Sequence, residues 1–202
     1  MDSIYYKYST IKNIYDEQID KDIYRTFPKN DYFKNPDNLK KLTRLLHAIA
    51  CHNPNTGYLQ GMNFIAGYLL LSNDDEIKSF NIFNDLIRNP KYSLGGLYIK
   101  EFPRLFLAIY QVNKLSQKYI RNVYKHLKKF NIKTSSWLSQ YLLTLCIKNI
   151  EYIGYNNYNV FFKLFMQQGW DILIKFIIKI LKINEKNIIE KENFSKLMVF
   201  LL

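Results

Sequence analysis

The sequence of 202 residues predicts an all-α fold with two helical halves. Apolar residues recur at steps of three and four along most of the chain, which is the spacing of one face of an α-helix. No stretch sustains the apolar–polar alternation that is typical of a half-buried strand. The seven glycines and five prolines are few, and this favours long helices over a β-fold with many turns.

Composition predicts a folded protein of a reducing compartment. Hydrophobic residues make up 48% of the chain and aromatic residues 16%, enough for a sizeable core and against disorder. The two cysteines, Cys51 and Cys146, lie far apart and form no disulfide framework. The chain opens without the apolar core of a signal peptide, and no apolar run approaches the ~20 residues that span a bilayer. We therefore expect a cytoplasmic protein.

The formal net charge is +12, from 29 basic and 17 acidic residues. Nucleic acid, an anionic membrane surface or an acidic partner would each fit such a charge. However, the lysines are scattered rather than blocked, and Lys, Asn, Ile and Tyr are used heavily throughout. We therefore favour a compositional bias, and nucleic-acid binding is the least favoured function.

The first half shows helix starts and stops that local chemistry explains. We expect residues 1–18 to be a loosely placed leader that could be truncated. Asn35 before Pro36 predicts a capped helix start, because Pro suits the first turn. Further on, we predict a buried helix over 64–71, a helix start with acidic residues at 72–76 and a stop at Asn89-Pro90.

The second half predicts five or more further helices. We expect a bend near Pro103, a helix capped by Ser135-Ser136, and a connector at Asn156-Asn157. A helix over 160–166 should stop near Gly169. The apolar tail after residue 196 leaves two alternatives, an incomplete chain or a final helix that docks on the body.

The stretch from Gly57 to Asn63 carries the strongest local signal. Two glycines, Gly57 and Gly61, bracket Tyr58 and Gln60, so the chain can turn tightly there and approach another surface closely. Gln60 would lie at or just before the start of the next helix, where unpaired N–H groups and the helix dipole favour negative charge. Such a Gln suits contact with a phosphate, or with a water molecule that attacks one.

A second stretch places Ile19, Asp22 and Arg25 three residues apart, roughly on one face of a helical turn. Asp22 could hold the Arg25 side chain through a charge-assisted hydrogen bond. Pro28 then ends the segment. Taken alone, Arg25 fits a surface ion pair, and Gln60 fits a residue that caps the helix backbone.

Together and in this order, the patterns I-x-x-D-x-x-R and Y-x-Q-G-M-N resemble the TBC domain, the GTPase-activating domain that acts on Rab-type small GTPases. The first pattern continues with Thr26 and Pro28. The second, from Tyr58 to Asn63, precedes an apolar helix as it does in the family. Segments of the second half, Val160-Phe161-Phe162-Lys163 and Gly169-Trp170-Asp171, are also similar to it. The resemblance covers residues 19–202.

The sequence departs from the family pattern at two places. The family usually has an Arg-x-x-x-Trp motif upstream of the arginine segment, and residues 1–18 contain none. Where the family usually has Ile-Trp-Asp, this chain has Phe161-Phe162-Lys163, which reverses a charge. Neither departure touches Arg25 or Gln60.

The resemblance implies a GTPase activator that supplies an arginine finger, Arg25, and a glutamine finger, Gln60, in trans. A guanidinium would neutralise charge near the γ-phosphate, and an amide would orient the attacking water. Asp22, Tyr58, Gly61 and Asn63 would be positioning residues. The alternative is a catalytically silent scaffold that binds a Rab-type GTPase in membrane traffic.

We expect no cofactor and no metal bound by this chain. It has no G-x-x-x-x-G-K-[ST] motif, so GTP and Mg²⁺ would be carried by the partner GTPase in its GTP form. His47, Cys51 and His52 lack a nearby carboxylate in the sequence, which argues against zinc. A basic stripe at Arg121, Lys125 and Lys128 fits a solvated helix face. Its alternative is contact with an acidic GTPase surface or, peripherally, an anionic endomembrane.

Overall fold

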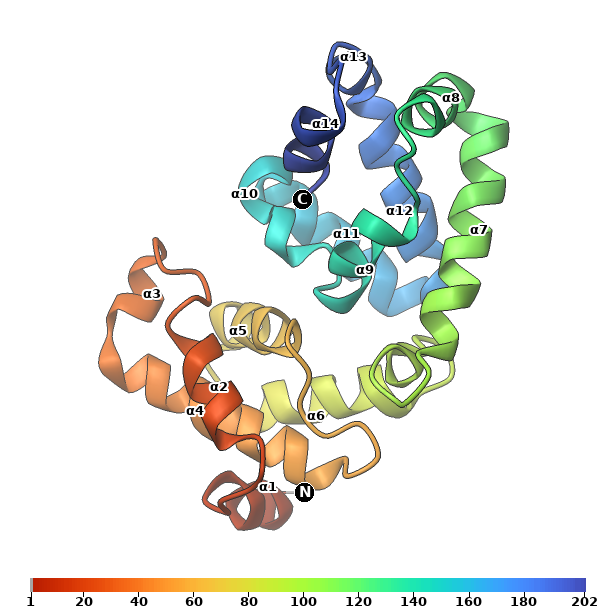
Figure 1. Cartoon of the computed structure of the whole chain (residues 1–202). Helices are drawn as coiled ribbons and strands as arrows, with labels where there is room; N and C mark the ends of the chain where they lie inside the picture. Colours follow the sequence, from red (N-terminus) through yellow and green to blue (C-terminus); the bar gives the residue numbers. More distant parts are fainter. Residues whose placement is uncertain (1) are drawn as a thin grey trace. The chain divides into compact units, whose positions relative to one another are not determined.

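A computed structural model describes residues 2–202, and within them the chain is helical and forms no strand. It divides into two compact units, Met1–Phe102 and Pro103–Leu202 (Figure 1). Both features confirm the prediction of an all-α fold in two helical halves.

The first unit contains six α-helices and one short 3₁₀ helix within its described residues. They are α1 (Asp2–Ser9), α2 (Asp16–Ile23), α3 (Asp31–Lys34), α4 (Pro36–His52), α5 (Met62–Asn73), α6 (Glu76–Arg88) and η1 (Leu94–Leu97).

Helix α4 is the centre of the first unit, since α1, α2, α3, α5 and α6 all pack against it. Its start is capped as predicted, because the Asn35 side chain accepts a hydrogen bond from the backbone N–H of Asp37 at 2.9 Å. Leu42, Leu45 and Leu46 on its inner face are completely buried. One amphipathic helix therefore supplies the surface on which its neighbours assemble.

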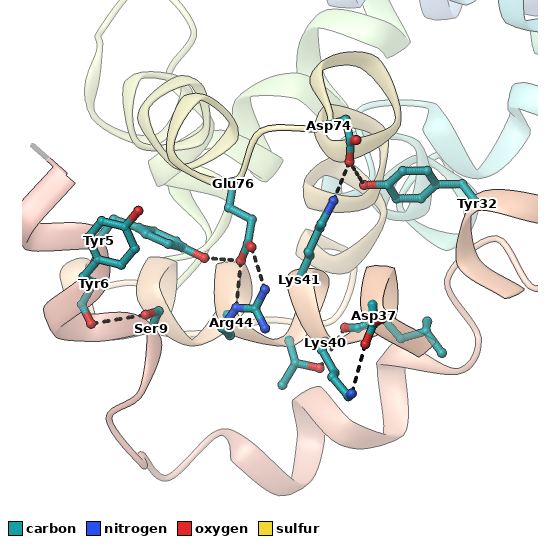
Figure 2. A network of polar contacts seen from close by, with 12 residues as sticks. Tyr5, Tyr6, Ser9, Tyr32, Asp37, Lys40, Lys41, Arg44, Asp74 and Glu76 are labelled. Atoms are coloured by element: carbon teal, nitrogen blue, oxygen red, sulfur yellow. Dashed lines mark hydrogen bonds and ion pairs between the residues drawn. The ribbon is translucent and has the colours of Figure 1, made fainter. Parts of the chain in front are cut away.

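Helix α1 differs from the expectation of a loosely placed leader. Tyr5 is buried, and its hydroxyl donates to Glu76 at the start of α6 (Figure 2). Arg44 of α4 holds the same carboxylate with two bonds, from Nε at 3.0 Å and from Nη2 at 2.6 Å. The packing of α1 follows from these long-range contacts, which local spacing cannot reveal. The domain boundary at residue 19 itself stays a prediction.

A second polar cluster fixes the turn between α5 and α6. Asp74 adopts a left-handed backbone with φ of 47°, and its carboxylate accepts from Tyr32 at 2.6 Å and from Lys41 at 2.7 Å (Figure 2). Asp75 then caps α6 by accepting from the N–H of Lys78 at 2.9 Å, as the sequence predicted for this region. The cluster ties α3 and α4 to the end of α5.

The second unit contains eight α-helices and a short 3₁₀ helix. They are α7 (Pro103–Tyr119), α8 (Arg121–Lys129), α9 (Ser135–Leu143), η2 (Ile147–Asn149), α10 (Ile150–Ile153), α11 (Tyr155–Gln168), α12 (Trp170–Ile183), α13 (Glu185–Ile189) and α14 (Phe194–Leu201).

Three local predictions in the second unit were wrong. Pro103 begins α7 instead of bending it, which suits a residue without an N–H. Ser135-Ser136 lie inside α9, where the cap position belongs to Thr134, but its hydroxyl donates to Asn113 of α7 instead. Asn156-Asn157 lie inside α11, because the chain breaks earlier, at Gly154 with φ of 85°.

Other predictions for the second unit were confirmed. Helix α11 ends at Gln168, directly before Gly169, which has φ of 76°. The apolar tail forms α14, whose Leu197 and Leu201 are buried, so this helix docks on the rest of its unit. Trp170 at the start of α12 donates to Gln111 of α7 at 3.0 Å, while the Arg104 guanidinium lies 4.1 Å from its ring centroid.

The packing of α5 generates a stability prediction. A Cβ atom at Gly67 would lie 2.9 Å from Thr26 Cγ2 and 3.1 Å from Phe27 Cε2, and both side chains are buried. We expect Gly67→Ala to lower the free energy of unfolding by about 1–3 kcal/mol, measured by urea denaturation. Adding Thr26→Ser, which removes Cγ2 but keeps the hydroxyl, should restore part of the loss. An unchanged or raised stability of Gly67→Ala would contradict this packing.

Candidate functional site

The arginine segment begins in α2 and continues one turn past its end. Ile19 and Asp22 are completely buried, whereas the Arg25 side chain is 47% exposed. Helix α2 ends at Ile23, yet the N–H of Arg25 still bonds the carbonyl of Asp22 at 3.3 Å. Of the three residues predicted to share roughly one face, Ile19 and Asp22 do so within α2, whereas Arg25 lies beyond the end of that helix. The apolar and acidic members face the core, and the basic member reaches solvent.

The buried carboxylate of Asp22 is the centre of the site. Its Oδ1 pairs with Nη2 of Arg25 and accepts from Nε2 of Gln18 at 3.1 Å. Its Oδ2 accepts from the hydroxyl of Tyr58 at 2.5 Å. A buried carboxylate is costly unless it is paired and hydrogen-bonded, and here three donors from three places in the sequence surround it. The contact between Asp22 and Arg25 that the sequence suggested is therefore present, with Gln18 as an additional partner.

The loop that carries Gln60 joins α4 to α5 and depends on its two glycines. Gly57 has φ of 56°, and a Cβ there would lie 2.1 Å from the Tyr15 hydroxyl oxygen. Gly61 has φ of 112° and donates its N–H to Asn63 Oδ1 at 3.0 Å. Both the tight turn and the close approach predicted for this loop are present.

Gln60 lies just before α5, as predicted, and its side chain is exposed. Its neighbours Tyr58, Gly61 and Asn63 are buried. No hydrogen bond engages the Gln60 amide within residues 2–202, and the start of α5 has no side-chain cap. The amide is therefore available to a group outside this chain, and the capping alternative finds no support.

Two hydrogen bonds tie the arginine segment to the glutamine loop. One joins Tyr58 to Asp22. The other runs from Asn63 Nδ2 to Thr26 Oγ1 at 2.8 Å, and Thr26 Oγ1 in turn donates to the carbonyl of Asp22 at 2.8 Å. These anchors flank Gln60 on one segment and Arg25 on the other. The two exposed side chains thus project from a common, buried scaffold.

Sequence reasoning missed Gln18 and Thr26 as members of this scaffold. Gln18 could have been found from its spacing, since residues four apart on a helix can bond. Thr26 stood beside Arg25 in the recognised pattern, but its bond to Asn63 spans 37 residues. No local signal predicts which hydroxyl such an amide will meet.

No group of three or more His, Cys, Asp or Glu side chains within the described residues could hold a metal ion. His47 does have a carboxylate nearby, which the sequence did not indicate: its Nε2 lies 3.4 Å from Asp16 Oδ1. Cys51 accepts a long bond from Asn13 Nδ2 at 3.5 Å, and burial raises the pKa of its thiol. His47 and Cys51 are thus explained by contacts of α4 with the start of α2 and with the residues just before it.

Within the residues that the structure describes, no helix is long and apolar enough to cross a membrane.

The comparisons with known proteins agree in one family. The family model for the Rab-GTPase-TBC domain matches residues 1–189. Among curated proteins, GTPase-activating protein GYP5 of Saccharomyces cerevisiae is 27% identical over the whole of this chain, which spans 21% of that protein. The Rab GTPase-activating protein eat-17 of Caenorhabditis elegans is 32% identical over 70% of this chain, which spans 16% of it. The chain thus matches about a fifth of these relatives' length.

Solved structures show the same fold. The TBC domain of a Chlamydomonas flagellar RabGAP superposes with a TM-score of 0.80 at 22% identity, over all of this chain and 66% of that one. The Ypt/Rab-GAP domain of Gyp1p superposes with a TM-score of 0.71 at 18% identity, over 99% of this chain and 70% of the other. At such identities the likeness extends to the fold alone.

The buried Tyr58 generates a prediction about alkaline stability. Burial, and the hydrogen bond to Asp22, raise the pKa of its phenol above the usual 10. The folded state therefore holds this proton more tightly than the unfolded state, so stability is complete below about pH 10 and is lost as pH rises above it. Burial raises the pKa of Tyr98 too, so part of the loss has another origin.

We expect Tyr58→Phe to be less stable than wild type at pH 7 by about 1–2 kcal/mol, because Asp22 loses a donor. Its stability should also decline less steeply than that of wild type between about pH 9 and 11, as followed by urea denaturation at several pH values. Tyr24→Phe, which removes a hydroxyl from a side chain 77% exposed, is the matched control and should behave as wild type. Equal alkaline slopes for Tyr58→Phe and wild type would count against the assignment.

Proposed function

This chain belongs to the Rab-GTPase-TBC domain family, and from that membership and the paired Arg25 and Gln60 segments we propose that it activates GTP hydrolysis by a Rab-type small GTPase. The chain would bind the GTPase in its GTP form and complete its active site in trans. GTP and Mg²⁺ would come with the GTPase. The names of the relatives as GTPase-activating proteins support this proposal.

Arg25 is the residue proposed to neutralise charge. When water attacks the γ-phosphorus and the bond to the β-phosphate oxygen breaks, negative charge spreads over the phosphate oxygens. A guanidinium offers a permanent charge and a planar fork of donors for such oxygens. Two observations support the role: the Arg25 side chain is 47% exposed, and it pairs with the buried Asp22. This pairing orients the guanidinium before any partner binds.

Gln60 is the residue proposed to orient the attacking water. Its amide carries both a donor and an acceptor. The amide oxygen can accept a hydrogen bond from the attacking water and so hold it with a lone pair directed at phosphorus. The exposed and unengaged amide supports this role. Tyr58, Gly61 and Asn63 would act as positioning residues, because they are buried and determine the path of the loop on both sides of Gln60.

One observation carries the proposal: both exposed side chains project from segments that are hydrogen-bonded to each other through Asp22 and Thr26. If Arg25 were only a member of a surface ion pair, Asp22 and Arg25 alone would be sufficient. Such a pair would not require the buried contacts from Tyr58 and Asn63 that hold the Gln60 loop beside them.

The second candidate is a scaffold that binds a Rab-type GTPase without accelerating it. The missing Arg-x-x-x-Trp motif and Lys163, an exposed residue of α11 where the family usually has Asp, motivate it. Either function would bring the chain to GTPases on endomembranes, where peripheral contact with anionic lipid through basic side chains is an added proposal.

The decisive measurement is single-turnover GTP hydrolysis by a panel of Rab-type GTPases with and without the chain. For a responsive GTPase, we expect Arg25→Ala to lower the stimulated rate by about 10³-fold or more and Gln60→Ala by about 10²–10³-fold. Arg25→Lys should restore little, since it keeps the charge and loses the fork. Lys21→Ala, which removes an exposed lysine from the same helix, should leave the rate unchanged.

Binding of each variant to the GTP-loaded GTPase is measured in parallel. If GTPases bind wild type and both variants equally, but none is accelerated, then the scaffold replaces the activator. If no GTPase of a complete panel binds or responds, both candidates are wrong.

The positioning role of Asp22 makes a separate prediction. Asp22→Asn should lower the maximal stimulated rate by about 10–100-fold with little change in the GTPase concentration that gives half of it, because Arg25 loses its orienting partner and keeps its charge. Stability is measured by urea denaturation in the same buffer. A raised half-saturating concentration with an unchanged maximal rate would place Asp22 in binding instead.

A further inference from the structure

The positive charge of the chain is concentrated in its second unit. Residues 103–202 contain 16 basic and 5 acidic residues, a net charge of +11, whereas residues 1–102 contain 13 and 12, a net charge of +1. Along the sequence the lysines are scattered rather than blocked. The division into units shows instead that nearly all the excess belongs to one of them, so this unit carries a strong preference for an anionic partner.

The same unit exposes an apolar groove along α11 and α12, with a cavity volume of about 710 Å³. The two helices are joined directly at Gly169 and run antiparallel (Figure 1). Phe161 and Phe176 stack with their ring centroids 3.9 Å apart. Ile153 at the end of α10 and apolar side chains from both helices line the groove with them: Val160, Leu164, Ile172, Ile180 and Ile183.

Several of these apolar side chains are strongly exposed. Val160 is 61% exposed, Ile183 is 69% exposed and Leu164 is 39% exposed. Single exposed apolar residues are ordinary, but a contiguous set that lines a concave surface is typical of a site where another molecule binds.

Charge complements the apolar lining. Lys175 and Lys179 of α12 line the groove, and among its described lining residues none is acidic. Lys182 nearby pairs with Glu185 at 2.5 Å, but neither Lys175 nor Lys179 forms an ion pair within residues 2–202. The groove thus offers an apolar floor flanked by two free ammonium groups.

We propose that this groove binds an acidic amphipathic helix of a partner protein. Helix-in-groove recognition needs apolar anchors at positions i, i+4 and i+7 on the incoming helix and a groove between two helices to receive them. Helices α11 and α12 have 14 residues each, a length of roughly 21 Å, which suits a partner helix of about four turns. Acidic residues beside the anchors would meet Lys175 and Lys179.

Other occupants fit less well. A second copy of this chain would bring a unit of charge +11 against another of the same charge. Nucleic acid would satisfy the lysines through phosphate but would offer little to the apolar floor. An anionic membrane favours apolar side chains that project from a convex surface, whereas these line a hollow. The inference is independent of the proposed GTPase activation, since the groove belongs to the other unit from Arg25 and Gln60.

The test uses a synthetic 16-residue peptide labelled with fluorescein, with Leu at i, i+4, i+7 and i+11 and Glu, Gln and Ala elsewhere. Binding to the full chain is followed by fluorescence anisotropy. We expect saturable binding that weakens as salt rises, and no binding of a scrambled peptide of the same composition. Ile183→Asp should weaken binding about tenfold or more, because an apolar contact is lost.

Lys179→Glu should weaken binding of the acidic peptide about threefold or more. The same variant should bind a peptide in which Lys replaces Glu more tightly than wild type does. Two substitutions outside the groove are matched controls: Val199→Asp for the apolar change and Lys125→Glu for the charge change, both at exposed positions of the same unit. Circular dichroism checks that every variant is folded.

The absence of saturable binding, or equal weakening by Val199→Asp and Ile183→Asp, would overturn the proposal. A parallel series uses phosphatidylcholine vesicles with and without phosphatidylserine. If the acidic vesicles bind, the peptide does not, and Ile183→Asp removes vesicle binding, then the groove serves a membrane and the helix proposal is wrong.

Discussion

The buried carboxylate of Asp22 is the constraint on which the candidate site depends. A charge removed from water must be surrounded by donors, and here they come from Gln18 on the same helix, Arg25 on the next turn and Tyr58 on a distant loop. The need to hydrogen-bond this one carboxylate therefore determines how the arginine segment and the glutamine loop lie against each other. The segments that carry the exposed Arg25 and Gln60 side chains are thus held together by Asp22, which is completely buried.

Two other acidic side chains of the first unit also join separate segments through hydrogen bonds and ion pairs. Glu76 accepts from Tyr5 and Arg44, and Asp74 accepts from Tyr32 and Lys41 (Figure 2). In each case one acid joins donors from separate helices. Residues 1–102 contain nearly as many acidic as basic residues, so acids are at hand for such contacts. The second unit has few acids to engage its basic residues, so its charge remains available to a partner.

Local chemistry predicted the helices better than the contacts between them. Asn35 before Pro36 and Gly169 after α11 mark helix ends through their own backbone preferences, so both were found from the sequence. The connector predicted at Asn156-Asn157 was wrong, because the chain already breaks at Gly154 and both asparagines lie inside α11, where the Asn157 amide donates to the carbonyl of Ile153 at the end of α10. The leader was misjudged for a different reason: Tyr5 is held by Glu76, 71 residues away.

The sequence by itself determined the all-α class, several helix ends and the identity of the two motif segments, since these depend on residue type and spacing over a few turns. Only the tertiary structure decided that Thr26 meets Asn63, that Tyr58 meets Asp22, and that basic residues of α12 border an apolar groove. These contacts depend on which surfaces pack together. Packing is a property of the whole folded chain, because each long-range contact becomes favourable only after the others have positioned its partners.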